Sequence, residues 1–565
     1  MSTKKKLLIS STEKANNWLS IIDDNNDKVK IKKLLDDNDK TNLIEAFHKN
    51  LEFGTGGMRG EIGIGSNKIN NYTIGLATQG LSNYLKKKVK GNIKACIAYD
   101  TRLFSKEFAY EVAQIFSSNN IKSYLFSDIR PTPVLSYAVR KLNCHCGIMI
   151  TASHNPKEYN GYKVYWSDGG QIVYPHDSNI INEVNKLDDI SDIRSDDESL
   201  IELVDDIVDK PYLKEVSKLS LFSNENSKLK ILYTPIHGTG LKMVPMAIKS
   251  FGFKNVSIIK SQENPDPNFS TVKSPNPEEY YALEEGIKEL KKTKSNILLA
   301  TDPDTDRVGV VELDKNSNET ILNGNQLASL IIHYVITQKI KDKSLQKNSY
   351  VAKTIVTTPI IDKICMKHSV PCYSTLTGFK NIAKLIEDKK NEQFIAGGEE
   401  SYGYLVGDFV RDKDAVISSS IICEISNFAK IKGMNLSDYL NKIYDAFGYY
   451  KDELLTMTFK GIEGKKKIDS IMHDYILNPP KSIFSKKIES YINYNKINND
   501  DIIKSKSNVL QFITKENYIL TVRPSGTEPK IKFYFSLNCK NVLNDIKKNN
   551  YLLENEIHKI KSKYE

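Results

Sequence analysis

Residues 146–156, with the sequence CGIMITASHNP, run from an apolar segment into a loop that carries Ser153 and His154. The apolar run 146–150 predicts a short buried strand, and Asn155-Pro156 and Asn160-Gly161 predict turns behind it. A serine on a loop after a buried strand is held rigidly and can face a cleft. Taken alone, the motif fits an ordinary turn equally well.

The same strand–loop–helix pattern recurs along the chain. Strands are expected at 93–99, which ends at Asp100-Thr101-Arg102, at 229–233 and at 350–356. Helix-period segments follow all three strands, at 105–118, at 241–250 and behind Thr357-Thr358-Pro359. Alternating strands and helices predict βαβ units around a mainly parallel sheet.

The domain organisation follows from this rhythm. After Gly461 the alternation is lost, and 518–522 and 531–535 predict paired strands. The expected fold is α/β: three related α/β domains with mixed sheets and a smaller C-terminal α+β domain. The expected boundaries are 1–205 with a helical N-terminal lead-in, 206–323, 324–455 and 456–565.

Length and composition limit the class of protein. A chain of 565 residues exceeds a single hydrophobic core. Its mean hydropathy of -0.42 is typical of soluble globular proteins, and no apolar run approaches the roughly 20 residues of a membrane span. The apolar run 7–9 is too short for a secretory signal. We therefore expect a cytoplasmic protein without a membrane partner.

Charge and cysteine usage argue against nucleic-acid binding and against a zinc site. The net charge is +10, but the lysines are dispersed among acidic residues, which indicates a solvated surface and not a nucleic-acid stripe. Mild basicity would favour phosphorylated substrates. The seven scattered cysteines predict free thiols. In Cys144-His145-Cys146 an extended chain turns the imidazole away from both thiols, which favours core packing over zinc.

A carboxylate cluster follows the apolar strand expected at 297–300. Asp302, Asp304 and Asp306 repel one another at two-residue spacing, so a fold that gathers them needs a cation. Oxygen ligands alone favour Mg²⁺. An EF-hand is excluded because Arg307 stands at the glycine position. The alternative interpretation is an acidic surface turn. If the segment does bind a metal, the metal would activate a phosphate and Arg307 would lie near that phosphate.

A glycine-rich segment, 53–60, fails the dinucleotide fingerprint because Arg59 stands where the third glycine belongs. It predicts either a phosphate contact through Arg59 or a plain flexible turn. In 397–403 a carboxylate and a hydroxyl two residues apart suit vicinal sugar hydroxyls, although an exposed loop explains them nearly as well. Residues 411–414 are either a surface charge cluster or a source of a phosphate ligand.

The segment 523–530 lies between the two C-terminal strands. One arginine, two hydroxyls and a glycine-permitted loop amide predict a phosphate cradle. It is not a Walker loop, which would open a helix.

Together these motifs resemble the α-D-phosphohexomutase superfamily, most closely the phosphoglucomutase/phosphomannomutase family, over nearly the whole chain. The resemblance implies four domains around a central cleft. It implies a phosphoserine at Ser153 with His154 beside it, and Mg²⁺ held by the phosphoserine, Asp302, Asp304 and Asp306. It assigns sugar binding to Glu399 and Ser401, and phosphate binding to Arg523, Ser525, Gly526 and Thr527. Further active-site positions are Arg59, Lys163, Arg307, Thr377, Gly378 and Lys413.

The resemblance also implies an activity: glucose 1-phosphate and glucose 6-phosphate are interconverted through a hexose 1,6-bisphosphate, which also acts as activator. Lys163 and Arg59 are candidates for removing the substrate proton. The expected partners are small sugar phosphates, with no nucleic acid and no obligate protein partner. A Ser-His-Asp hydrolase is disfavoured because adjacent side chains point apart in an extended segment.

Substrate choice stays open at this level. The Gly-Glu-Glu-Ser-Tyr-Gly loop resembles the glucomutase form, with Tyr402 where phenylalanine is familiar. Residues 160–166 resemble the branch that includes phosphopentomutases, so mannose or pentose phosphates are alternatives. A catalytically silent phosphosugar-binding protein is the alternative from another class, and nucleic-acid binding through the positive charge is a third.

Overall fold

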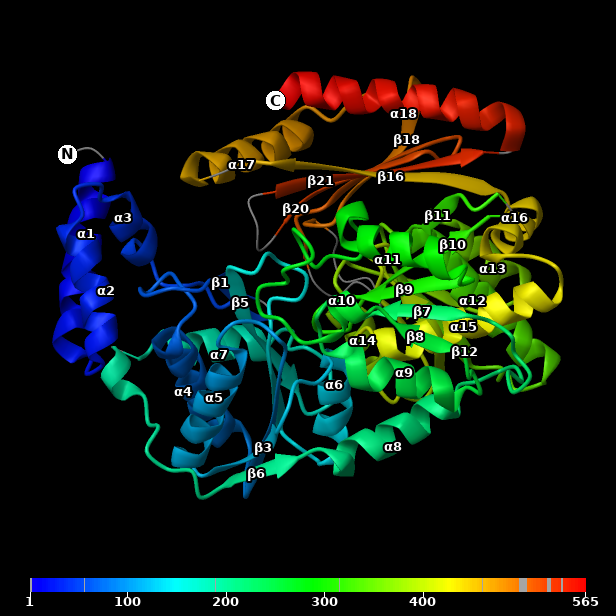
Figure 1. Ribbon diagram of the computed structural model, residues 1–565. Helices are drawn as coiled ribbons and strands as arrows, with labels where there is room; N and C mark the ends of the chain where they lie inside the picture. The colour runs from blue at the N-terminus through cyan, green and yellow to red at the C-terminus, as the bar shows by residue number, and fades with distance from the viewer. Residues whose placement is uncertain are drawn as a thin grey trace. The chain divides into compact units, whose positions relative to one another are not determined.

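The computed structural model describes residues 3–54, 56–187, 189–314, 316–459, 461–496, 506–525, 530–539 and 542–565 (Figure 1). The chain forms two compact units. The first comprises Met1–Ile321 and Gly407–Glu424, and the second comprises Leu322–Val406 and Ile425–Glu565. Each unit contains two sheets. The finer division into four domains stays a prediction.

The first sheet of unit 1 is mixed. Its strand order is β1 (Gly57–Glu61), β5 (Tyr159–Trp166), β4 (Cys146–Ile150), β2 (Ile93–Tyr99), β3 (Ile121–Phe126) and β6 (Ile201–Val204). The last four are parallel, while β1 and β5 run antiparallel to their neighbours. Every residue of β4 is buried, as expected for a central strand covered on both faces.

Four helices flank this sheet: α4 (Asn71–Lys88), α5 (Ser105–Ser118), α6 (Thr132–Lys141) and α7 (His176–Val184). The first, second and fourth share one apolar cluster with the strands, whereas α6 contacts β2 and β4 from outside that cluster. Tyr99 pairs with Ile150 at the carboxyl ends of β2 and β4. The loops that begin at Asp100 and Thr151 therefore leave the same edge of the sheet.

One expectation for this sheet is wrong, because Asn160-Gly161 lies inside β5 and not in a turn. Of the two alternatives for the glycine-rich segment, the plain flexible turn is wrong, because the segment continues into strand β1, where Arg59 pairs with Gly161. The reason is close backbone packing. A Cβ at Gly161 would lie 2.6 Å from the Thr151 carbonyl oxygen and 2.7 Å from that of Met58. This glycine serves strand approach and not a reverse turn.

The second sheet of unit 1 has the order β11 (Glu319–Leu322), β10 (Val308–Leu313), β9 (Ile297–Thr301), β7 (Ile231–Thr234) and β8 (Val256–Ile258). Strands β9, β7 and β8 are parallel, and β10 is antiparallel to β9. Its helices are α9 (Gly240–Ser250), α10 (Lys260–Glu263) and α11 (Tyr280–Thr293), after the connecting helix α8 (Asp206–Ser217). The tight β9–β10 connection is the segment 302–307.

Residues before the first sheet are helical, as expected. The helices are α1 (Thr3–Ile21), α2 (Asn25–Asp36) and α3 (Thr41–Phe47). Trp18 of α1 contacts Phe47 of α3 and Tyr72 of α4 edge to face. The polar stretch 189–198, which includes the short helix η1 (Ile190–Asp192), leads into β6 and so stays inside unit 1.

Unit 2 contains a mixed and an antiparallel sheet. The mixed sheet has the order β13 (Cys372–Thr375), β12 (Ser349–Thr354), β14 (Gln393–Gly398) and β15 (Tyr404–Val406). Its helices are α12 (Gly324–Lys341), α13 (Ile360–Lys367), α14 (Phe379–Asp388) and α16 (Leu436–Phe447). Helix α15 (Ala415–Ile431) carries the chain from one unit to the other.

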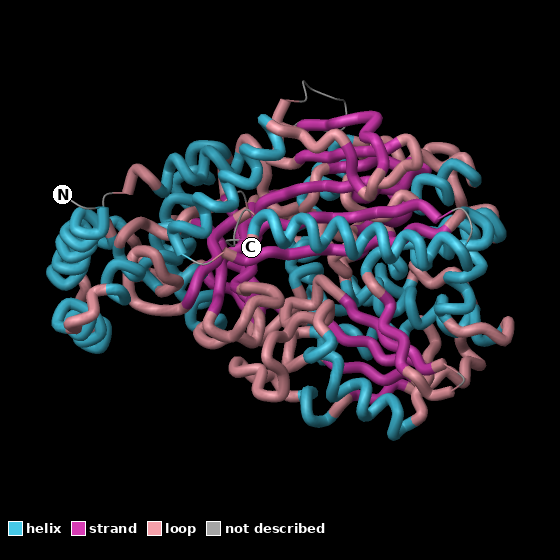
Figure 2. The backbone as a smooth tube through the Cα atoms, turned by 90° about the horizontal axis from the view of Figure 1, so that it is seen from above, coloured by secondary structure: helices cyan, strands magenta, loops and turns pink. Residues whose placement is uncertain are grey.

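The antiparallel sheet has the order β16 (Tyr449–Thr458), β21 (Lys530–Cys539), β20 (Ile519–Pro524), β19 (Leu510–Thr514), β18 (Lys486–Asn493) and β17 (Ser482–Ile483). Helices α17 (Gly461–Leu477) and α18 (Val542–Tyr564) share its apolar cluster, and Figure 2 shows α18 lying across the strands. The three mixed sheets and this smaller α+β portion confirm the expected fold class.

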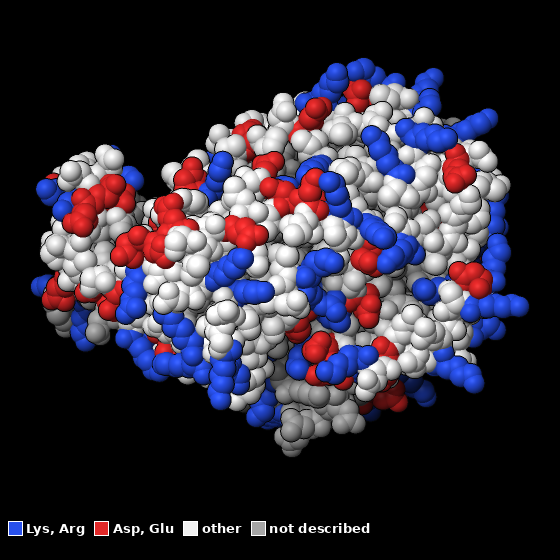
Figure 3. All heavy atoms as spheres, turned by 90° about the horizontal axis from the view of Figure 1, so that it is seen from below, with Lys and Arg blue, Asp and Glu red and all other residues white. Residues whose placement is uncertain are grey.

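Charge and thiols are distributed as predicted. On the face drawn in Figure 3, lysines and arginines are scattered among acidic side chains. All seven cysteines are free, and all are buried except Cys372, which is half-buried. Burial raises the pKa of Cys144 to about 12. No helix within the described ranges is long and apolar enough to cross a membrane.

Candidate active site

The loop after β4 holds Ser153 in an unusual backbone conformation. Its φ is 53°, in the left-handed region, and its side chain is buried. The Ser153 amide donates to Thr151 Oγ1 at 2.8 Å, and its hydroxyl donates to Asp302 Oδ2 at 2.9 Å. The predicted serine loop thus meets the predicted carboxylate cluster directly.

The expectation that Ser153 and His154 point apart is wrong. Ser153 Oγ lies 3.2 Å from His154 Nδ1, because the left-handed residue turns the chain instead of extending it. The arrangement is still not that of a hydrolase triad, in which histidine stands between serine and carboxylate. Here Asp302 contacts the serine itself.

The β9–β10 turn gathers three buried carboxylates, whose oxygens approach within 4.8 Å of one another. Asp302 Oδ1 accepts hydrogen bonds from the amides of Asp306 and Arg307. Oδ1 of Asp304 and Oδ1 of Asp306 are buried without a hydrogen-bond partner among the described residues. Burial and the two neighbouring carboxylates raise the pKa of Asp302. Bare, mutually repelling oxygens fit a hard divalent cation.

Two lysines reach this cluster. Lys163 Nζ on β5 lies 2.7 Å from Asp304 Oδ2 and 3.5 Å from Asp306 Oδ2, and Lys413 Nζ lies 3.0 Å from Asp306 Oδ2. Burial acts to lower the pKa of Lys163, but the two aspartates raise it above its usual value. The ammonium group therefore stays charged, which suits charge compensation better than proton abstraction.

Two predicted arginines also lie here. Arg59 Nη1 donates to Asn155 Oδ1 at 3.0 Å, two residues beyond the serine. Arg307 Nη1 bonds to Glu278, and its Nε lies 3.7 Å from Asp306 Oδ1. Unit 1 therefore gathers all nine of the predicted site residues that it contains: Arg59, Ser153, His154, Lys163, Asp302, Asp304, Asp306, Arg307 and Lys413.

Arg102 belongs to this site although no sequence motif pointed to it. Its guanidinium is buried beneath the serine loop, where Nη2 donates to the Ser153 carbonyl oxygen at 2.6 Å. The available signal was its place directly after strand 93–99, because parallel strands that are neighbours end at the same sheet edge. Thr132 was missed too; its hydroxyl donates to Asp304 Oδ2 at 3.0 Å.

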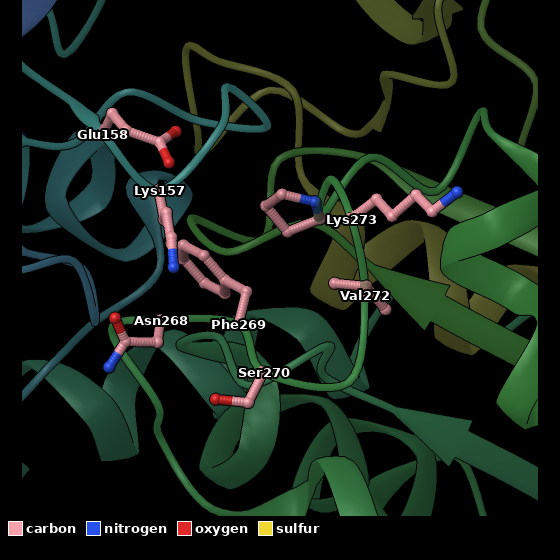
Figure 4. A pocket seen from close by; sticks show the side chains of 8 residues that line it. Lys157, Glu158, Asn268, Phe269, Ser270, Val272 and Lys273 are labelled. Carbon is pink, nitrogen blue, oxygen red and sulfur yellow. The ribbon is translucent and has the colours of Figure 1, made fainter.

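A cavity of about 480 Å³ opens on unit 1 beside the serine loop (Figure 4). It is lined by Lys157, Glu158, Asn268, Phe269, Ser270, Val272, Lys273 and Pro275. The Lys157 side chain runs alongside the Phe269 ring, while Lys273 points away from it. The same ring lies 5.1 Å from the Arg102 guanidinium carbon.

The predicted sugar loop lies in unit 2, after β14. The Gly378 amide donates to Glu399 Oε1 at 2.8 Å, so the Thr377-Gly378 turn orients this carboxylate. Gly378 has a φ of 100°, which only glycine adopts without strain. The turn at Tyr402 is left-handed as well. The Glu399 amide donates to the Gly403 carbonyl oxygen at 2.9 Å, closing the loop around Ser401.

The segment predicted as a phosphate cradle begins at the end of β20 in the C-terminal sheet. Burial and Glu399 raise the pKa of Glu400 to about 7, while Lys532 and Arg523 act to lower it. Arg523 at the end of β20 is therefore one of the charged groups that act on the Glu400 carboxyl. The Ser525 amide donates to the Lys530 carbonyl oxygen at 2.8 Å. Gly526 and Thr527 lie outside the described residues.

Comparison with known families agrees with this geometry. Three family models match consecutive parts of the chain: α/β/α domain I of phosphoglucomutase/phosphomannomutase at residues 50–191, domain II at 210–315 and domain III at 323–447. The chain belongs to the phosphoglucomutase/phosphomannomutase family. The serine loop, the carboxylate cluster and the sugar loop fall within the first, second and third matches respectively.

Individual family members support this assignment. A phosphoglucomutase of Staphylococcus haemolyticus is 38% identical over 93% of this chain and 96% of its own. Two solved structures have the same fold. Parafusin, a phosphoglucomutase of Paramecium in an open form, gives a TM-score of 0.67 at 18% identity, covering 88% of this chain and 91% of its own. A family protein of Burkholderia thailandensis gives 0.64 at 17% identity, covering 89% and 97%.

Proposed function

We propose that this chain is a phosphoglucomutase that interconverts glucose 1-phosphate and glucose 6-phosphate through a phosphoserine at Ser153. Membership of the family makes it a phosphohexose mutase, an isomerase that moves a phosphoryl group. The observation that carries the proposal is the contact of the Ser153 hydroxyl with Asp302, inside a cluster of buried carboxylates. The preference for glucose is supported by the name of the 38% identical relative.

The reaction assigns each group of unit 1 a task. The bond between phosphorus and Ser153 Oγ breaks as a new bond forms to the oxygen of the free sugar hydroxyl, whose proton ends on Ser153 Oγ, giving the 1,6-bisphosphate. Transfer of its other phosphoryl group then restores phosphorylated Ser153. Asp302, Asp304 and Asp306 would hold Mg²⁺, which supplies charge neutralisation at the phosphoryl oxygens when bound. Lys163 and Lys413 hold the carboxylates in place as fixed cations.

The remaining cations would face the substrate. Arg59 and Arg307 would contact the moving phosphate, with His154 beside the serine. A guanidinium stays protonated at neutral pH and Lys163 is held charged by its aspartates. We therefore assign these three to charge stabilisation, in place of the base role predicted for Arg59 and Lys163.

Unit 2 would supply the substrate grip. Glu399, oriented by Gly378, accepts hydrogen bonds from sugar hydroxyls together with Ser401, and Thr377 shapes the same turn. Arg523 and Ser525, with Gly526 and Thr527, would bind the phosphate that is not reacting. A hexose 1,6-bisphosphate would act as activator by restoring phosphorylated Ser153. We further propose a cytoplasmic location and no obligate protein or nucleic-acid partner.

A coupled assay tests the substrate assignment. Glucose 1-phosphate, mannose 1-phosphate and ribose 1-phosphate are compared as substrates, each with Mg²⁺ and a catalytic amount of the corresponding sugar bisphosphate. Glucose 1-phosphate should give the highest kcat/KM. Faster turnover of either competitor would reassign the enzyme to mannose or pentose phosphates, and absence of turnover with all three would favour a phosphosugar-binding protein.

Replacing the phosphorylated group tests the mechanism. Ser153→Ala should lower kcat by at least about 10⁴-fold, because no covalent carrier remains, while the thermal unfolding curve stays within a few degrees. Mass spectrometry of the wild-type protein during turnover should find phosphate on the peptide that contains Ser153. A wild-type enzyme that is active but never phosphorylated there would refute the mechanism.

A further inference from the structure

The hydrogen bonds from the Arg102 side chain to the serine loop all go to backbone carbonyl oxygens of the loop. Its Nη1 donates to the carbonyl oxygens of Pro156 at 2.8 Å and Tyr159 at 2.9 Å, and its Nη2 donates to those of Ser153 and Asn155. One planar guanidinium thus binds four carbonyl groups within seven residues. A rigid fork of donors is needed to reach them together.

The guanidinium is itself anchored by Asp100. Arg102 Nε lies 3.3 Å from Asp100 Oδ2, and both side chains are buried. The same carboxylate accepts hydrogen bonds from Ser105 Oγ and from Thr151 Oγ1, and the latter oxygen accepts the Ser153 amide hydrogen. The ion pair therefore joins the end of β2 to the end of β4.

A third contact covers the guanidinium. The Arg102 guanidinium carbon lies over the Phe269 ring, 5.1 Å from its centroid, and the same ring lines the cavity of Figure 4. Exclusion of water matters here because a hydrated guanidinium would bind the carbonyl groups less strongly. Asp100, Phe269 and the four carbonyl groups together leave the Arg102 side chain one position.

We propose that Arg102 is the positioning residue that sets the direction of the Ser153 hydroxyl. A left-handed serine is strained and persists only where its surroundings determine it on several sides. Arg102 does this by fixing the carbonyl groups at and after Ser153, so the hydroxyl points at Asp302 before substrate arrives. The inference rests on the proposed function, in which this hydroxyl carries the phosphoryl group.

The test compares two arginines of equal burial. Arg102 and Arg130 are each 3% exposed, each is ion-paired, and each lies against a phenylalanine ring. Arg130 pairs with Asp205 and Asp209 and has no hydrogen bond to the serine loop among those given by the structure. Arg102→Lys keeps the charge beside Asp100 but cannot span four carbonyl groups, and Arg130→Lys is the matched control.

Arg102→Lys should lower kcat by about 100-fold, the size of effect that a misplacement of about 1 Å produces, while KM changes less than about 3-fold. Hydrogen exchange at the amides of Ser153, Asn155 and Tyr159 should become at least about 10-fold faster. Arg130→Lys should leave both quantities within about 3-fold of wild type. Exchange is measured without substrate, so it tests Arg102 even if the protein proves to have no mutase activity.

A second variant guards against misfolding. Asp100→Asn combined with Arg102→Gln removes both buried charges together, which folded proteins tolerate better than an unpaired carboxylate. It should show the same loss of kcat and the same faster exchange. The proposal is overturned if folded variants keep wild-type kcat and loop exchange, if Arg130→Lys loses as much kcat, or if neither Arg102 variant folds.

Discussion

Single residues decide the chemistry of this site, and Ser153 illustrates how far sequence can predict them. The position of a serine after a buried strand was legible from the apolar run before it. Its left-handed backbone was not, because the Arg102 guanidinium that holds this conformation comes from the end of another strand and meets the loop only in the folded chain. The contact with His154 follows from the same turn and was missed for the same reason.

Asp306 tests the metal site. The side chains of the carboxylate cluster are held by backbone amides and lysines, with bare oxygens left over. Millimolar Mg²⁺ should therefore raise the unfolding temperature of metal-stripped protein. At a concentration of 100 times the Kd, the free energy of unfolding should increase by roughly 2.7 kcal/mol. Asp306→Asn should abolish that Mg²⁺-dependent rise. An equal rise in the variant, measured by calorimetry, would show that Mg²⁺ binds elsewhere.

Glu400 predicts a pH dependence of stability. Its pKa is raised from a usual value of 4.5 to about 7, so the folded protein keeps a proton that the unfolded chain releases. The contribution of this group to stability is full below about pH 4.5 and is lost as pH rises through 7, by about 3 kcal/mol in all.

Urea unfolding at pH 5 and pH 8 checks this expectation. Between pH 5 and pH 8, Glu400→Gln should lose about 2.5 kcal/mol less of its free energy of unfolding than wild type does. Asp414, whose pKa burial also raises to about 7, stays in both proteins and leaves a residual slope. Equal pH dependence in the two proteins would place the titrating carboxyl elsewhere.

At the scale of elements, the spacing of apolar residues in the sequence was sufficient to predict the bounds of elements that are well buried. Strands β2 and β4 and helix α5 have the predicted bounds, because their apolar patterns coincide with their packing. The β5 strand was missed because Asn160-Gly161 is a turn signal in isolation. Its partners β1 and β4 override that local preference by bringing two backbones within contact of Gly161.

Helix α12 offers a test at this scale, because it begins against the sugar loop. A Cβ at Gly324 would lie 1.8 Å from the Glu400 carbonyl oxygen and 3.0 Å from the Tyr402 amide nitrogen. Gly324→Ala should displace this loop, raise KM for the sugar phosphate about 10-fold, and lower the free energy of unfolding by about 1–3 kcal/mol.

Gly63→Ala is the matched control for that change, since its nearest neighbour is the flexible Lys68 side chain at 3.6 Å. It should leave KM unchanged. An unchanged KM in Gly324→Ala as well would show that the loop adjusts independently of the helix.

At the scale of the whole molecule, the chain leaves unit 1 at Ile321 and returns through Gly407–Glu424. That returning segment carries Lys413 to the carboxylate cluster. It also carries Asp412 and Asp414, which accept hydrogen bonds at 2.6 Å from the buried hydroxyls of Tyr165 and Tyr212. The sequence of the charge cluster 411–414 does not show that the chain returns to unit 1 here, because the residues that bind Asp412 and Asp414 lie about 200 residues earlier.

Truncation should expose this dependence. A chain that ends at residue 321 leaves both tyrosine hydroxyls buried without acceptors, at a cost of about 1–3 kcal/mol each. It should unfold at a lower temperature than a chain that ends at residue 424 and show a weaker Mg²⁺-dependent rise. Equal melting curves by circular dichroism would show that unit 1 does not need the returning segment.

The seclusion of six thiols has a practical consequence for studying this protein in motion. Maleimide dyes react with thiolates at the surface, and the native chain offers them only the half-buried Cys372. With that position changed to serine, one engineered cysteine per unit would accept a donor and an acceptor fluorophore on a nearly silent background. Single-molecule energy transfer could then follow the separation of the two units through the catalytic cycle.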